Sequence, residues 1–147
     1  MNAQQLTQAV LKAIEDQKWN AALALLTDDF RFSGAVPEPI TGEQWIGVHK
    51  ALAAAMPDLR FNYVATGGGD QLAEGTVALT GTHTGEFAPP MPGVPRVPAT
   101  GKQIANPKEH VWVTVRGDKI VNYKVEQVPD GGVVGILKQM GVALPHA

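Results

Sequence analysis

The sequence has no cysteine, almost no net charge and no long apolar run. The lack of cysteine among 147 residues excludes disulfides, thiolate metal sites and cysteine nucleophiles, and it favours a reducing compartment, so we expect a cytoplasmic protein. The 12 basic and 14 acidic residues leave a net charge of −2, which offers no electrostatic surface for nucleic acid or an anionic membrane. No segment approaches the ~18 consecutive apolar residues of a membrane span. We therefore expect neither nucleic acid nor membrane as a partner.

What the chain does contain is typical of a folded globular protein. Apolar residues make up 44% and charged residues 18% of the sequence, which excludes intrinsic disorder. The 16 glycines and 11 prolines indicate many turns, and therefore strands, rather than a helical bundle. The length is close to the ~150 residues typical of one domain, so we expect a single domain over residues 1–147.

Three helices are predicted in the first part of the chain. Apolar residues at helical spacing predict a helix over 4–18, and a short second helix follows over 19–26. Thr41 and Gln44 have the spacing of a capping box, in which each side chain bonds the other residue's backbone N–H. A third helix is therefore expected to begin there and to end before Pro57, whose ring cannot continue a helix.

The remainder of the chain alternates apolar and polar residues, as strands do. Four strands are predicted, over 59–66, 71–86, 108–116 and 119–128. A last helix follows and is closed by Gly141 as a left-handed cap residue. Helices followed by hairpin-connected strands predict an α+β fold. We expect a curved, mostly antiparallel sheet that wraps around the N-terminal helices and encloses a cone with an apolar interior.

Several segments match the pattern of a known family. Residues 55–61 are AMPDLRF, residues 81–87 are GTHTGEF, and Thr100-Gly101-Lys102, Lys119-Ile120-Val121 and residues 136–141 (ILKQMG) follow in the same order. Together they resemble SnoaL-like polyketide cyclases, within the nuclear-transport-factor-like superfamily. The resemblance implies a cone-shaped α+β barrel that forms a homodimer through the outer face of its sheet. It also implies a pocket for a small apolar, carbonyl-bearing molecule.

The resemblance further implies an intramolecular aldol condensation that needs neither metal nor organic cofactor. In the family, an acidic residue near the end of the last strand exchanges the proton. This chain has no aspartate in that strand, and Glu126 is the nearest carboxylate. Many proteins with this fold perform other reactions, because a fold does not determine chemistry.

The candidate catalytic residues are His83, Glu126 and His110. Removal of a proton beside a carbonyl needs a base, and it needs a donor that stabilises the enolate oxygen. His83 shares a predicted strand face with the apolar residues Val77 and Leu79, so we expect it to face the cavity as base or orienting group. Glu126 is its expected acidic partner.

The alternation of the last two strands leaves their orientation open. Either Glu126 faces the cavity, or Tyr123 and Gln127 do. In the preceding strand, either Glu109 or His110 lies inside, because neighbours in a strand point to opposite faces.

Six further residues are predicted to bind the ligand, because each has an aromatic or apolar side chain that is expected to point inward. They are Trp45, His49, Tyr63, Phe87, Met91 and Tyr123. The proline-rich loop 88–100, which contains Met91, is either a stiff connector or a lid over the mouth of the cone, with Arg96 as an anion contact. The four histidines do not have the spacing of metal ligands, so no metal site is expected.

The sequence therefore predicts a cofactor-independent cyclase or isomerase that performs aldol-type or enolisation chemistry on a small apolar ketone or ester. The alternative is a binding or accessory protein that holds a ligand in the same cavity without turnover. A third interpretation is an assembly domain, which would require the cone to be filled by side chains.

Overall fold

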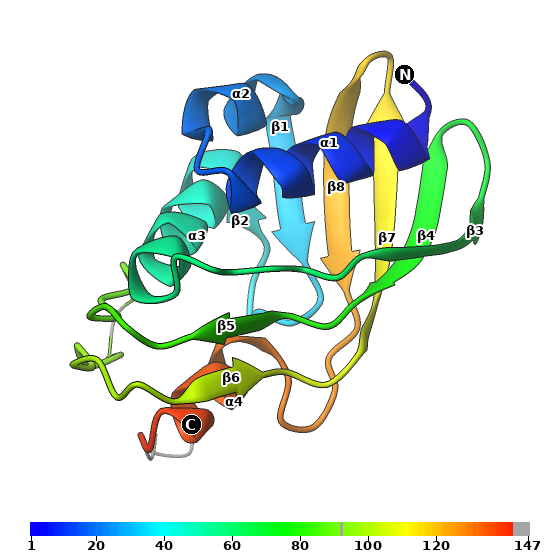
Figure 1. The fold of residues 1–147 in the computed structure, drawn as a ribbon. Coiled ribbons are helices and arrows are strands. Elements are labelled where there is room, and N and C mark those ends of the chain that lie inside the picture. The colour runs from blue at the N-terminus through cyan, green and yellow to red at the C-terminus, as the bar shows by residue number, and fades with distance from the viewer. Residues whose placement is uncertain (92, 143–147) are drawn as a thin grey trace.

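The computed structural model describes residues 1–91 and 93–142. Its helices are α1 (Ala3–Glu15), α2 (Trp19–Ala24), α3 (Gly42–Ala55) and α4 (Gly132–Gln139). Its strands are β1 (Leu26–Ser33), β2 (Ile40–Thr41), β3 (Val64–Gly68), β4 (Leu72–Val77), β5 (Thr80–Thr82), β6 (Gln103–Ala105), β7 (Glu109–Arg116) and β8 (Lys119–Val125). Figure 1 shows α1 crossing one face of the large sheet, with α2 and α3 beside it and α4 near β6.

Six strands form one mixed sheet in the order β2-β1-β8-β7-β4-β3. Neighbouring strands are antiparallel except β1 and β8, which run parallel and bring an early strand beside the last one. β5 and β6 pair separately as a two-stranded sheet. The α+β prediction is confirmed: N-terminal helices cover a curved mixed sheet, and a short helix follows it.

The ends of α3 and α4 agree with the capping and stop residues predicted from the sequence. At the start of α3, Thr41 Oγ1 accepts from the backbone N of Gln44 at 3.2 Å, and Gln44 Oε1 accepts from the backbone N of Thr41 at 2.9 Å. This is the predicted capping box. α3 ends at Ala55, before Pro57. Gly141, just beyond α4, has a φ of +90°, as expected for a left-handed cap residue.

Two predicted strands are shorter than expected. The predicted strand 71–86 breaks into β4 and β5 because the chain leaves the large sheet after Val77. Ala78 N then donates to Phe61 O, and Thr80 begins the pairing with β6. The predicted strand 59–66 begins only at Val64, because Asn62 has a left-handed φ of 53° that interrupts extended backbone.

The core lies between the helices and the concave face of the sheet. Leu6, Val10 and Ile14 of α1 are fully buried there, as are Val111 and Val113 of β7. Within the described part of the chain, no helix is long and apolar enough to cross a membrane.

One glycine positions the segment that follows β1. Gly34 has a φ of +100°, and a Cβ at this position would lie 1.9 Å from the carbonyl oxygen of Val125. Only glycine fits where the chain crosses so close to the end of β8. The next residues, 35–38, are thereby held at the rim of a cavity.

Candidate functional site

A cavity of about 780 Å³ lies between α3, the concave face of the sheet and α4. This volume is in the range of about 300–1,000 Å³ that is usual for small-molecule sites. Most of the wall is hydrocarbon. Representative lining residues are Phe32, Leu52, Phe61, Val77, Val125 and Ile136.

Trp45 is at the centre of an aromatic cluster in this wall. Its ring lies 5.1 Å from Tyr123, 5.0 Å from His49 and 5.8 Å from Phe32, measured between ring centroids. Trp45 and His49 are on adjacent turns of α3, so helical spacing brings both to the same face. The cluster joins the helix to β1 and β8 and forms one side of the cavity.

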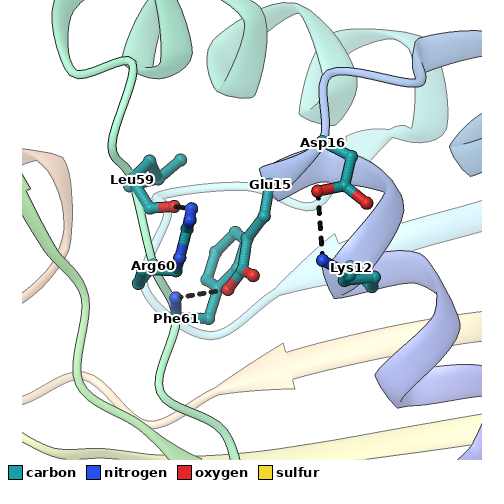
Figure 2. Close-up of polar contacts among 6 residues, drawn as sticks. All are labelled: Lys12, Glu15, Asp16, Leu59, Arg60 and Phe61. Carbon is teal, nitrogen blue, oxygen red and sulfur yellow. Dashed lines mark hydrogen bonds and ion pairs between the residues drawn. The ribbon is translucent and has the colours of Figure 1, made fainter.

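Phe61 completes this side, and α1 determines its position. The carboxylate of Glu15, near the end of α1, accepts a hydrogen bond from the backbone N of Phe61 at 2.9 Å (Figure 2). The same figure shows Arg60 donating to the carbonyl oxygen of Leu59 at 2.8 Å. The backbone of Arg60 also pairs with Thr80 in an isolated antiparallel bridge, and the Phe61 ring lies 5.6 Å from His49.

His49 is a neutral imidazole with one free acceptor. Its Nδ1 lies 2.8 Å from the carbonyl oxygen of Trp45, which can only accept, so Nδ1 carries the proton. Burial lowers the pKa of His49 to about 4. Nε2 has no hydrogen-bond partner among the described residues, and protein atoms do not enclose it completely. The lone pair of Nε2 therefore faces the cavity.

Tyr123 presents a phenol that stays protonated. The residue is 3% exposed. Its hydroxyl has no hydrogen-bond partner among the described residues, and protein atoms do not enclose it completely. Burial raises the pKa of Tyr123, with smaller contributions from Tyr63 and from the charge of Glu109. The hydroxyl can thus donate to a ligand oxygen in the cavity.

Glu109 is the one buried carboxylate in the cavity wall among the described residues. It is 6% exposed, and its Oε2 accepts from the backbone N of Gly132 at 3.2 Å. Burial raises the pKa of Glu109, the bond from Gly132 opposes this, and the charge of Glu126 adds to the rise. Such a carboxylate is a stronger base than one in water.

The mouth of the cavity is more polar than its depth. Glu38, Glu43 and Gln44 line it and are exposed. Across the described residues, no three side chains of histidine, aspartate or glutamate are arranged to hold a metal ion.

The structure brings four of the predicted ligand-binding residues to the cavity wall: Trp45, His49, Met91 and Tyr123. Met91 and Pro90 show that the proline-rich loop reaches the cavity. Arg96, expected as an anion contact, is instead paired with Glu86 at 2.9 Å.

The expectation that His83 faces the cavity is not met. His83 directly follows β5, is completely buried and does not line the cavity. Its Nδ1 forms a hydrogen bond with Thr100 Oγ1 at 2.8 Å. The predicted face is correct, since Val77, Leu79 and His83 are all buried, but the cavity is lined by Val77 and Leu79 and does not extend along this face to His83. Its Nε2 is buried without a partner among the described residues.

Glu126 and His110 also point away from the cavity. Glu126 is exposed beyond the end of β8, and Gln127 is exposed as well. His110 stacks on Trp112 on the outer face of the sheet, with ring centroids 5.2 Å apart. Of the two alternatives in β7, Glu109 is therefore the inner residue. Strand parity explains the positions of Glu109, His110 and Glu126, whereas Gln127 lies beyond the end of β8 and is exposed.

Tyr63 and Phe87 lie outside the cavity too. The left-handed backbone of Asn62 reverses the alternation after Phe61, so the Tyr63 hydroxyl bonds Gln4 of α1 instead. Phe87 is fully buried in the core, and its backbone pairs with Val97 in both directions.

Two residues of the cavity wall, Phe61 and Glu109, were not among the predicted site residues, although Glu109 was left open as the alternative to His110. The contact that holds Phe61, in which its backbone N–H donates to the Glu15 carboxylate, has no local signal in the sequence. Glu109 had a signal: it shares a strand face with three valines, 111, 113 and 115, whereas the other face carries Trp112. The more apolar face is the inner one.

The comparisons with known proteins agree with this architecture. The model of the SnoaL-like domain family matches residues 7–123. No curated protein matches the sequence.

Solved structures share the fold at low sequence identity. IdmH of Streptomyces antibioticus, a candidate polyketide cyclase, has a TM-score of 0.71 and 22% identity, with 97% of this chain and 100% of that chain covered. A SnoaL-like polyketide cyclase of Agrobacterium tumefaciens has a TM-score of 0.63 and 16% identity, with coverages of 85% and 90%. A Catenulispora acidiphila protein with a ketosteroid isomerase-like fold, in complex with trimethylamine, has a TM-score of 0.65 and 17% identity, with coverages of 94% and 93%. Because the family model spans most of the sequence, the chain belongs to the SnoaL-like domain family.

Proposed function

We propose that this protein is a cofactor-independent enzyme of the cyclase or isomerase kind, which enolises a small apolar ketone or ester in the cavity. The observation that carries the proposal is the pairing of a buried carboxylate, Glu109, with a free phenol, Tyr123, in a wall that is otherwise mostly hydrocarbon. Both residues line the same cavity, from the adjacent strands β7 and β8.

The proposed reaction uses each group in one role. The Glu109 carboxylate takes the proton from the carbon beside the carbonyl, and the C–H electron pair becomes the enolate double bond. The Tyr123 hydroxyl donates a hydrogen bond to the oxygen that gains negative charge. The enolate carbon then forms a bond to a second carbonyl carbon of the same molecule, and Glu109 returns the proton to the new alkoxide. Without a second carbonyl, reprotonation gives an isomer or exchanges the hydrogen.

Hydrogen exchange tests this proposal without knowledge of the natural substrate. In heavy water, 4-(4-tert-butylphenyl)butan-2-one should gain deuterium beside its carbonyl faster with the protein than without it, as measured by mass spectrometry. We expect Glu109→Gln to abolish the acceleration and Tyr123→Phe to reduce it by about 10²-fold, a usual loss for one oxyanion donor. Because the base must be ionised, the rate should rise with pH through the raised pKa of Glu109.

Glu126→Gln is the matched control, because it removes a carboxylate on the opposite, exposed side of the sheet. It should retain the exchange activity. Loss of exchange in Glu126→Gln but not in Glu109→Gln would contradict the proposed base.

The second candidate function is ligand binding without turnover. It is favoured by the hydrogen bond from Gly132, which occupies an oxygen of Glu109 and opposes the rise of its pKa. Tight ketone binding with no exchange in the same experiment would support this alternative.

We also propose that two copies pair through the outer face of the sheet. Trp112 is half-buried there, stacked on His110, with Lys124 Nζ 5.6 Å from its ring centroid. Thr114 and Glu126 on the same face are exposed, so the face is open to a partner.

A further inference from the structure

The cavity carries charge of one sign only. Its charged lining residues, among those that the structure describes, are Glu38, Glu43 and Glu109. No lysine or arginine joins them, and the nearby Arg96 is held by Glu86. A carboxylated or phosphorylated ligand would therefore bring its charge to a site without a cationic partner, which is unfavourable.

The N-terminus of α3 does not supply such a partner either. Free backbone N–H groups at a helix N-terminus commonly bind anions. Here the capping box between Thr41 and Gln44 occupies two of these groups, and Glu43 places a negative charge in the first turn. The rim of the cavity at this helix end is negative rather than positive.

The two exposed glutamates line the same cavity as the aromatic ring of Phe32. Phe32 of β1 pairs in register with Ile40, and Glu38 and Glu43 flank that residue along the chain. The Phe32 ring lines the cavity and stacks on Trp45. A cavity wall that offers both carboxylates and an aromatic ring favours an alkylated ammonium group, which combines charge with an apolar surface.

The depth of the cavity supplies an independent sign of a ligand. The hydroxyl of Tyr123 and Nε2 of His49 belong to side chains that are more than nine-tenths buried, and neither atom has a partner among the described residues. His49 Nε2 and Glu109 can only accept hydrogen bonds. The Tyr123 hydroxyl can donate to a carbonyl oxygen, so a carbonyl end of the ligand would bind at Tyr123.

We propose that the ligand is an amphipathic ketone or ester with a positively charged nitrogen at its outer end, held at the mouth by Glu38, Glu43 and Phe32. Its carbonyl end lies at Tyr123 and Glu109, so this orientation rests on the proposed function. The cation is kept away from Glu109, which leaves that carboxylate free to act as the base. Negative charge around the entrance also attracts such a ligand from solution.

Two ketones of nearly equal shape test this ligand class. They are 4-(4-trimethylammoniophenyl)butan-2-one and its neutral counterpart 4-(4-tert-butylphenyl)butan-2-one, with 4-(4-carboxyphenyl)butan-2-one as the anionic compound. Binding is measured by titration calorimetry at about 20 mM salt. We expect the cationic ketone to bind about tenfold more tightly than the neutral one and the anionic one to bind most weakly. The preference should decline in 1 M salt, because the mouth is exposed and its charges are screened.

Matched double variants assign the preference to the mouth. Glu38→Gln with Glu43→Gln should remove the advantage of the cationic ketone and leave the affinity for the neutral ketone within about twofold. Asp28→Asn with Asp118→Asn changes the net charge equally at exposed positions outside the cavity, and it should keep the preference. Equal binding of the two ketones, no binding of the cationic one, or a preference that survives the Glu38 and Glu43 substitutions would overturn the proposal.

Hydrogen exchange tests the proposed enolisation independently of the binding preference. If the cationic ketone is preferred but neither ketone exchanges hydrogen, the ligand class stands and the enolisation does not. If both exchange and neither is preferred, the reverse holds.

Discussion

His49 is held neutral by the fold, and this makes stability depend on pH. The pKa of His49 falls from 6.5 to about 4 on burial. As the pH drops through 6.5, the unfolded chain takes up a proton that the folded protein does not accept until about pH 4. The folded state therefore loses stability over that interval and is unaffected by His49 above it.

We expect His49 to contribute a loss of about 3 kcal/mol in the free energy of unfolding between pH 6.5 and 4. His49→Phe keeps an aromatic ring beside Trp45 and should remove that part of the loss, measured by urea unfolding at several pH values. His110→Phe, on the outer face, is the matched control and should retain the loss. A wild-type acid dependence in His49→Phe would show that another group is responsible.

Residue positions were predictable where helical spacing alone determines them. Trp45 and His49 are four residues apart, so both lie on the face of α3 that turns inward. In strands, alternation shows only that Glu109 and His110 point to opposite faces. The choice depends on which face the helices cover, and three valines on the Glu109 side carried that information.

At the scale of elements, local signals predicted helix ends better than strand ends. The capping box and Pro57 determine α3 from residues within a few positions of each end. A strand instead ends where its partner is lost. The continuous run of residues 71–86 breaks because β5 pairs with β6, which is far along the chain. His83 follows this pairing and is buried beyond the part of the face that lines the cavity.

The contact between α1 and the segment before β3 is likewise invisible in the sequence. The carboxylate of Glu15 accepts a hydrogen bond from the backbone N–H of Phe61. Glu15→Ala would leave this N–H without a partner, so we expect the substitution to lower the free energy of unfolding by about 1–3 kcal/mol. Ketone binding should weaken as well, since Phe61 lines the cavity. Urea unfolding and calorimetry measure the two effects.

Lys12 is the matched control on the same helix. It forms an exposed pair with Asp16 at 3.1 Å, and such pairs contribute about 0.5 kcal/mol or less. Lys12→Ala should therefore leave both stability and binding nearly unchanged. An effect equal to that of Glu15→Ala would mean that α1 acts through its general stability rather than through the bond to Phe61.

At the scale of the whole molecule, the sheet has one face for the cavity and one for solvent. β1 and β8 lie side by side although about 90 residues separate them, and this pairing joins the N-terminal helices to the last hairpin. Local patterns predict the hairpins but not this closure. The order of helices and strands predicted the curved sheet around the helices, but no local pattern predicted that β1 pairs with β8.

The outer face provides the last prediction, which concerns the assembly. If two copies pair through it, the wild-type protein should have about twice the 15.6 kDa mass of one chain in sedimentation velocity. Trp112→Glu places a carboxylate between His110 and Lys124 on this face. Because burying a charge at an interface is costly, the variant should be monomeric at micromolar concentration. Asn20→Glu adds the same charge on the exposed surface of α2 and should remain dimeric. A monomeric wild type, or a Trp112→Glu variant that stays dimeric while folded by circular dichroism, would exclude this face as the interface.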